Sequence, residues 1–83
     1  MKEFTVYTKP SCAQCDMAKN FLKSKGHTYK EVELDVGQPK VAGKVYEDVT
    51  TFRTSYPEVK SAPQIFVNGQ RIGGFNELRQ MLQ

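Results

Sequence analysis

Hydrophobic and polar residues alternate near the start of the chain and then change to helical spacing. Residues 3 to 8 alternate and are rich in β-branched and aromatic types, which predicts a β-strand. From Ala13 to Lys25 apolar residues recur every three or four positions, with Gly26 placed to end the helix. A second alternating stretch, Lys30 to Val36, predicts a second strand. Strand, helix and strand in this order form a βαβ unit.

The middle of the chain carries a second helical pattern. Val41, Val45, Val49 and Phe52 fall on one stripe of a helix, so the spacing predicts a helix over 41–52. Gly43 lies inside this segment and lowers its helix propensity. We nevertheless expect a helix here, in the connection that leads to the next strand.

The last third of the chain predicts a hairpin followed by a helix. Gln64–Val67 and Gln70–Ile72 flank the dipeptide Asn68-Gly69, which is the signal of a two-residue type I′ turn between antiparallel strands. Phe75–Leu82 has helical spacing. The order β-α-β-α-β-β-α predicts an α/β protein with a thioredoxin-like fold, a four-stranded mixed sheet with helices on its faces and a right-handed first crossover.

Composition indicates a single globular domain over residues 1–83. The chain is 39% hydrophobic and 25% charged, as in ordinary soluble proteins, and has no apolar stretch near the ~20 residues of a membrane span. Its start lacks the pattern of a secretory signal. A net charge of +3 favours anionic partners but is too small for a nucleic-acid groove. We expect a cytoplasmic monomer without membrane or nucleic-acid partners.

Two cysteines lie where the first strand gives way to the first helix. Cys12 and Cys15 are separated by two residues, and within a βαβ unit this spacing is typical of a redox pair. At the first turn of the helix, unpaired N–H groups and the helix dipole favour a thiolate at Cys12. Cys15, one turn further in, is suited to resolve a mixed disulfide by attacking the sulfur of Cys12. We therefore predict Cys12 as nucleophile and Cys15 as resolving thiol.

Other interpretations of the cysteine pair are weaker. Structural zinc needs four protein ligands, whereas the chain has two cysteines and one histidine, His27, at a predicted turn; we expect no metal site. Two inert structural thiols, in a thioredoxin-fold interaction module, would show no thiol reactivity.

Lys9, three residues before Cys12, is either a solvated lysine or a cation that stabilises the thiolate or binds an anionic substrate group.

A proline and a glycine pair complete the candidate site. Pro63 begins the third predicted strand, and by itself it would be expected trans, since only about 5 to 6% of X-Pro bonds are cis in folded proteins. Gly73 and Gly74 precede the last helix, whose N-terminal N–H groups form a natural carboxylate site. Taken alone, the glycine pair is equally consistent with a simple turn.

With these residues in place, the chain resembles the glutaredoxins across essentially its whole length. The resemblance is carried by YTKPSCAQC at 7–15, SAPQIFVNGQ at 61–70 and RIGGFNEL at 71–78. It implies a cis Pro63, with the backbone of Ala62 pairing antiparallel to the cysteine of bound glutathione. It also implies that Lys9, Gln14 and Lys60 contact glutathione. By the same resemblance, its γ-glutamyl end is received at the last helix by Gly74, Phe75 and Asn76.

The sequence departs from the common glutaredoxin pattern at three places. Between the cysteines stand Ala13 and Gln14, where the family most often has proline and tyrosine; this resembles glutaredoxin-like redoxins that thioredoxin reductase reduces. Asn76 stands where an aspartate is usual, which removes a charged contact to the glutathione ammonium. The connection from Val36 to Ala62 is long and resembles phage-encoded members, for which the location would be the host cytoplasm.

The resemblance implies a dithiol thiol-disulfide oxidoreductase. We expect it to reduce protein disulfides, that of ribonucleotide reductase among them, and glutathione mixed disulfides, with glutathione as co-substrate and no tightly bound cofactor. One alternative is a redoxin that depends on thioredoxin reductase. The other is a carrier in which Cys12 and glutathione from two protomers hold a [2Fe-2S] cluster.

Overall fold

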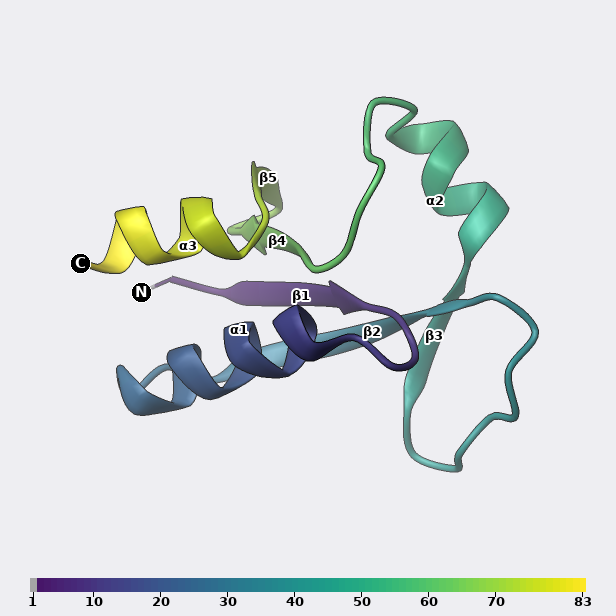
Figure 1. Ribbon diagram of the computed structural model, residues 1–83, viewed down its shortest axis with the longest axis horizontal. Coiled ribbons are helices and arrows are strands. Elements are labelled where there is room, and N and C mark those ends of the chain that lie inside the picture. The colour runs from purple at the N-terminus through teal and green to yellow at the C-terminus, as the bar shows by residue number, and fades with distance from the viewer. Residues whose placement is uncertain (1) are drawn as a thin grey trace.

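The computed structural model describes residues 2–83 and contains one mixed sheet with helices on both faces (Figure 1). The elements in chain order are β1 (Phe4–Thr8), α1 (Ala13–Ser24), β2 (Tyr29–Asp35), β3 (Val45–Asp48), α2 (Val49–Ser55), β4 (Gln64–Val67), β5 (Gln70–Gly73) and α3 (Phe75–Leu82). The strand order is β3-β2-β1-β4-β5. β1, β2 and β3 run parallel, whereas β4 is antiparallel to β1 and β5. No helix of residues 2–83 is long and apolar enough to cross a membrane.

The sheet has five strands rather than the four predicted, because part of the predicted helix over 41–52 is a strand. Val45–Asp48 forms β3 and pairs with β2 from Val32 to Asp35. Val41 and Val45 are 66% and 52% exposed, so they contribute nothing to a buried helical stripe. The helix begins only at Val49, after Asp48, whose carboxylate accepts a hydrogen bond from Thr51 N at 3.0 Å as the N-cap.

Two hydrophobic clusters fix the helices to the sheet. Alternate residues of β1 point to the face covered by α1 and α3, where six side chains are buried together: Phe4, Val6, Ala18, Leu22, Ile65 and Leu78. Leu34, Phe52 and Phe66 form the second cluster, beneath α2 on the other face. Figure 1 shows α2 set apart from α1 and α3. The helices α1 and α3 therefore cover one face of the sheet, and α2 covers the other.

The long connection between β2 and β3 is held to the sheet by charge. Lys44 Nζ lies 2.7 Å from a carboxylate oxygen of Glu33 and 3.8 Å from one of Glu31. Lys19 of α1 lies 3.3 Å from Glu31, and Gln38 donates to Glu33 at 2.8 Å. Hydrogen bonds from Lys44 and then Gln38 hold the pKa of Glu33 below its usual value, and the bond to Glu33 raises the pKa of Lys44. This network gives the long connection a structural role.

Candidate functional site

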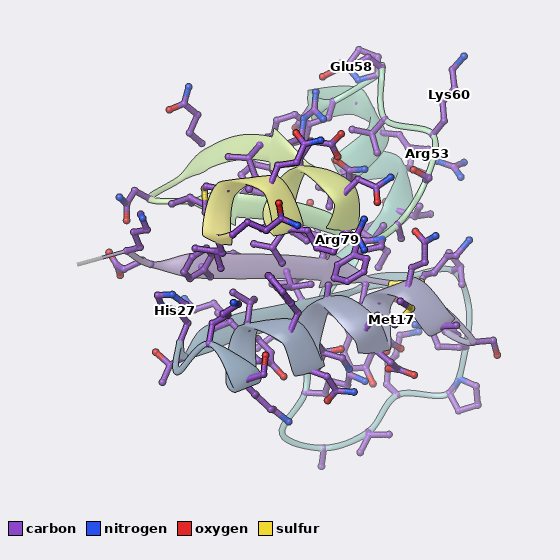
Figure 2. The ribbon with its side chains drawn as sticks, turned by 60° about the vertical axis from the view of Figure 1, so that its left-hand side comes forward. Met17, His27, Arg53, Glu58, Lys60 and Arg79 are labelled. Carbon is purple, nitrogen blue, oxygen red and sulfur yellow. A yellow bond between two sulfur atoms is a disulfide. The ribbon has the colours of Figure 1, made fainter. Side chains whose placement is uncertain are left out.

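Cys12 and Cys15 lie at the N-terminus of α1 and are joined by a disulfide, with 5.3 Å between their Cα atoms. Cys12 has extended backbone angles and acts as the N-cap, since its Sγ accepts a hydrogen bond from Cys15 N at 3.2 Å. Cys15 is 2% exposed, whereas Cys12 is only half-buried. Figure 2 shows the disulfide at the start of α1, near Met17. An incoming sulfur can therefore reach Cys12 more easily than Cys15.

The segment before β4 forms the opposite wall of the site. The peptide bond between Ala62 and Pro63 is cis, as the family resemblance implies and as the proline alone would not predict. Cys12 Sγ lies 3.8 Å from the carbonyl oxygen of Ala62. In the oxidised protein this sulfur has no proton to donate, so the distance records proximity. A substrate sulfur bonded to Cys12 would lie beside the backbone of Ala62.

Two clefts meet at Ser61 and Ala62 and contain the predicted glutathione-binding residues. The larger, of about 430 Å³, is lined by Gln14, Ala62, Pro63, Gly74, Phe75 and Asn76 among others. A smaller pocket of about 90 Å³ has Lys9, Lys60 and Ala62 in its lining. All eight predicted residues thus line one of two clefts that share Ala62, whose carbonyl oxygen lies 3.8 Å from Cys12 Sγ. Whether they bind glutathione stays a prediction.

The glycine pair brings the N-terminus of α3 against Pro63. Gly73 has φ of +127°, a conformation that side chains rarely adopt. A Cβ atom on Gly74 would lie 3.4 Å from the carbonyl oxygen of Pro63, an ordinary van der Waals contact, which shows how near the start of α3 lies to Pro63. Gly74 N donates to Glu77 Oε1 at 2.8 Å, while the N–H groups of Phe75 and Asn76 lie in the first turn, where helices have unpaired donors. Because the Glu77 carboxylate lines the same cleft and accepts from Gly74 N, the N–H groups of Phe75 and Asn76 are the ones left for an incoming carboxylate.

The structure adds residues that the sequence did not point to. Arg71 of β5 donates to Glu58 at 2.7 Å and to Gln64 at 3.2 Å, and Gln64 donates to the carbonyl oxygen of Ser61 at 3.0 Å. These bonds brace the segment that carries Ala62. Arg53 of α2 lines the smaller pocket. No local sequence pattern signals either role, because both depend on contacts between distant segments.

His27 lies at the far end of α1 from the cysteines (Figure 2). Its ring packs edge-on against Phe4, with 5.0 Å between ring centroids. His27 thus lies in the connection after α1, as expected, but its ring is half-buried against Phe4 and not fully solvated. Within residues 2–83, no three potential metal ligands among His, Cys, Asp and Glu come together.

A C-x-x-C pair at a helix N-terminus, facing a cis-proline segment in this fold, defines a thiol-disulfide oxidoreductase. The sequence profile of the glutaredoxin family matches residues 4–72. The chain belongs to the glutaredoxin family, and the predicted thioredoxin-like fold is confirmed.

Curated relatives and solved structures agree with this assignment. Glutaredoxin 3 of Escherichia coli K12 is 32% identical over 78 residues, covering 94% of this chain and 83% of that protein. Mitochondrial glutaredoxin-2 of Bos taurus is 34% identical over 76 residues, covering 92% of this chain but only 45% of the bovine protein, so the chain spans less than half of that relative. Glutaredoxin 1 from Francisella tularensis superimposes with a TM-score of 0.65 at 21% identity, covering 96% of this chain and 91% of the other. The buckwheat glutaredoxin-glutathione complex gives a TM-score of 0.70 at 22% identity, covering 95% and 66%. Both structural similarities concern the fold alone.

Proposed function

We propose that this glutaredoxin reduces protein disulfides and glutathione mixed disulfides with electrons from glutathione. The observation that carries the proposal is the position of Cys12. This residue is half-buried, and its sulfur lies 3.8 Å from the carbonyl oxygen of Ala62, a residue that both clefts share. A peptide paired with the backbone of Ala62 would present its own cysteine to Cys12. Cys15, 2% exposed, is reserved for the second step.

The reaction balances with two glutathione molecules per disulfide. The Cys12 thiolate attacks one sulfur of the substrate disulfide, and the other substrate sulfur leaves as a thiolate. The Cys15 thiolate then attacks Cys12, which releases the second substrate thiolate and forms the Cys12–Cys15 disulfide seen in the structure. One glutathione thiolate opens this disulfide at Cys12, and a second removes the first as oxidised glutathione.

The helix terminus and the lysines around the site support glutathione as the ligand. The N–H groups at the start of α3 would take the γ-glutamyl carboxylate, in the larger cleft with Gly74, Phe75 and Asn76. Lys9 and Lys60 flank the other side of Ala62 and would attract the carboxylate of the glycine. The glutathione complex of the buckwheat protein supports the choice of ligand. Asn76 carries no charge, so the γ-glutamyl ammonium lacks an acidic partner at that position.

The disulfide of ribonucleotide reductase is one protein substrate that we propose. Reduction of such disulfides requires a compartment that keeps glutathione reduced, and we propose the cytoplasm for that reason. We further propose that the 83 residues act as a single domain and as a monomer.

A side-by-side assay tests the electron donor. The protein is supplied with a disulfide substrate and either glutathione with glutathione reductase or thioredoxin reductase alone, at one protein concentration. We expect turnover with glutathione. Turnover only with thioredoxin reductase would contradict the proposal and place the protein with the redoxins that this reductase serves. A brown preparation with visible absorbance would instead support the [2Fe-2S] carrier.

A further inference from the structure

The smaller pocket beside Ala62 has an apolar floor. Five side chains form it: Leu34, Val36, Val49, Phe52 and Val59. Leu34 and Phe52 are 8% and 1% exposed, so the floor is continuous with the core beneath α2. Its volume of about 90 Å³ compares with about 30 Å³ for one water in the liquid. The pocket therefore has room for a short aliphatic side chain.

The rim of the same pocket is cationic. Lys9, Arg53 and Lys60 line it, and no carboxylate is among its lining residues. Within residues 2–83 none of these three side chains forms an ion pair, whereas Lys40 and Lys44 are both paired with acids. Figure 2 shows Arg53 and Lys60 on the same side of the molecule. The rim is complementary to a negatively charged partner.

The direction of the chain at Ala62 decides which part of a substrate reaches this pocket. The backbone runs from Lys60, at the small pocket, through Ala62 to Gln64, at the larger cleft. A peptide that pairs antiparallel with Ala62 runs the opposite way. The residue that follows its cysteine therefore lies over the small pocket. In glutathione that residue is glycine, which has no side chain and leaves the apolar floor uncovered.

We propose that this pocket selects protein disulfides in which the residue after the reacting cysteine is a short aliphatic, followed by a carboxylate. The aliphatic side chain fills the floor formed around Val49 and Val59, and the carboxylate meets the cations of the rim. The inference rests on the proposed function, because it takes its direction from the antiparallel pairing at Ala62. It makes protein disulfides of this type better partners than glutathione at the same site.

Three peptides test whether the pocket selects the residue after the cysteine: Ala-Cys-Val-Asp, Ala-Cys-Gly-Asp and Val-Cys-Gly-Asp. Each is used as a disulfide that joins two copies of the same peptide. The pre-reduced protein is mixed with each, and the second-order rate constant of reduction is measured by stopped flow. We expect the first peptide to react about tenfold faster than the second, the scale at which apolar pockets discriminate, and the third to react like the second. Equal rates for all three, or a faster third peptide, would overturn the proposal.

Variants separate the floor from the rim. Val59→Thr places a hydroxyl in the floor and should reduce the valine-to-glycine rate ratio at least threefold. Val36→Thr makes the same change at another residue of the floor. Because the Val36 side chain is 56% exposed, this variant should fold, and it replaces Val59→Thr in the test if Val59→Thr unfolds. A ratio that stays unchanged in the folded variants contradicts the role of the floor.

Arg53→Glu should slow the acidic peptides severalfold, whereas Lys30→Glu, at the opposite end of the sheet, changes the net charge equally and should not.

Because the protein is reduced beforehand, the outcome does not depend on the donor that regenerates it. Failure to reduce any of the peptides would contradict the proposed function itself. Reduction of all three at one rate would contradict only the selection by the pocket.

Discussion

Replacement of Lys9 or Lys60 by alanine should raise the KM for glutathione without changing kcat. Both lysines are exposed and line the pocket beside Ala62, so each would attract the glycine carboxylate through solvent. Exposed ion pairs contribute about 0.2 to 1 kcal/mol, and about 1.4 kcal/mol corresponds to a factor of ten. Each substitution should therefore raise KM up to about fivefold, and the double variant should show roughly the product of the two effects.

Salt provides a second measure of the same interaction. The screening length falls from about 10 Å at 0.1 M ionic strength to about 3 Å at 1 M, so the difference between wild type and variants should shrink as salt is added. The assay is steady-state turnover with glutathione and glutathione reductase. Lys30→Ala is the matched control, because Lys30 is exposed near the start of β2, at the end of the sheet away from the cysteines. If Lys9→Ala and Lys60→Ala behave like Lys30→Ala, the lysines do not bind glutathione and the reasoning is refuted.

Three further predictions concern the cysteines, the core and the charge network. With the reduced protein, alkylation should modify Cys12 before Cys15, which is 2% exposed; preferential modification of Cys15 in a peptide map would reverse the assigned roles. Phe52→Ala should lower the free energy of unfolding by about 3 to 5 kcal/mol, since Phe52 is 1% exposed and anchors α2; a loss below 1 kcal/mol in urea titration would contradict this. The lowered pKa of Glu33 and the raised pKa of Lys44 imply that their pair stabilises the fold fully between their ordinary pKa values of 4.5 and 10.5. This contribution is lost as pH falls through the lowered pKa of Glu33 or rises through the raised pKa of Lys44. Lys44→Met should therefore be less stable than wild type at pH 7 but lose less stability between pH 5 and pH 3, and parallel curves would argue against the pair.

Most of the fold follows from local patterns, but β3 does not. Four valine and phenylalanine positions at helical spacing indicated a helix over 41–52, yet Val45 belongs to an edge strand that exists only because β2 lies beside it. A short strand followed directly by a helix produces the same spacing by coincidence. The N-cap at Asp48 was a local signal that would have placed the start of the helix correctly.

The site also contains residues that local sequence predicts and residues that only tertiary contacts bring together. The two cysteines lie within one turn of a helix that follows a strand, so local sequence predicts their place in the fold. The glycine pair precedes the last predicted helix, but its sequence alone did not distinguish a binding role from a simple turn. The cis peptide bond at Pro63 followed from family resemblance and not from the residue. The brace from Arg71 through Gln64 to Ser61, and the pocket that Arg53 shares with Lys9, arise from tertiary contacts that no local pattern encodes.

The central claim is that Cys12 exchanges disulfides with glutathione while Cys15 resolves the product. Its most direct test is the intact mass of reduced Cys15→Ser after incubation with oxidised glutathione. The Cys12 thiolate should attack one glutathione sulfur and release the other as reduced glutathione, so the account predicts a single glutathionyl group that peptide mapping locates on Cys12. A Cys15→Ser protein that remains unmodified, under conditions in which wild type is oxidised to its internal disulfide, would contradict the account.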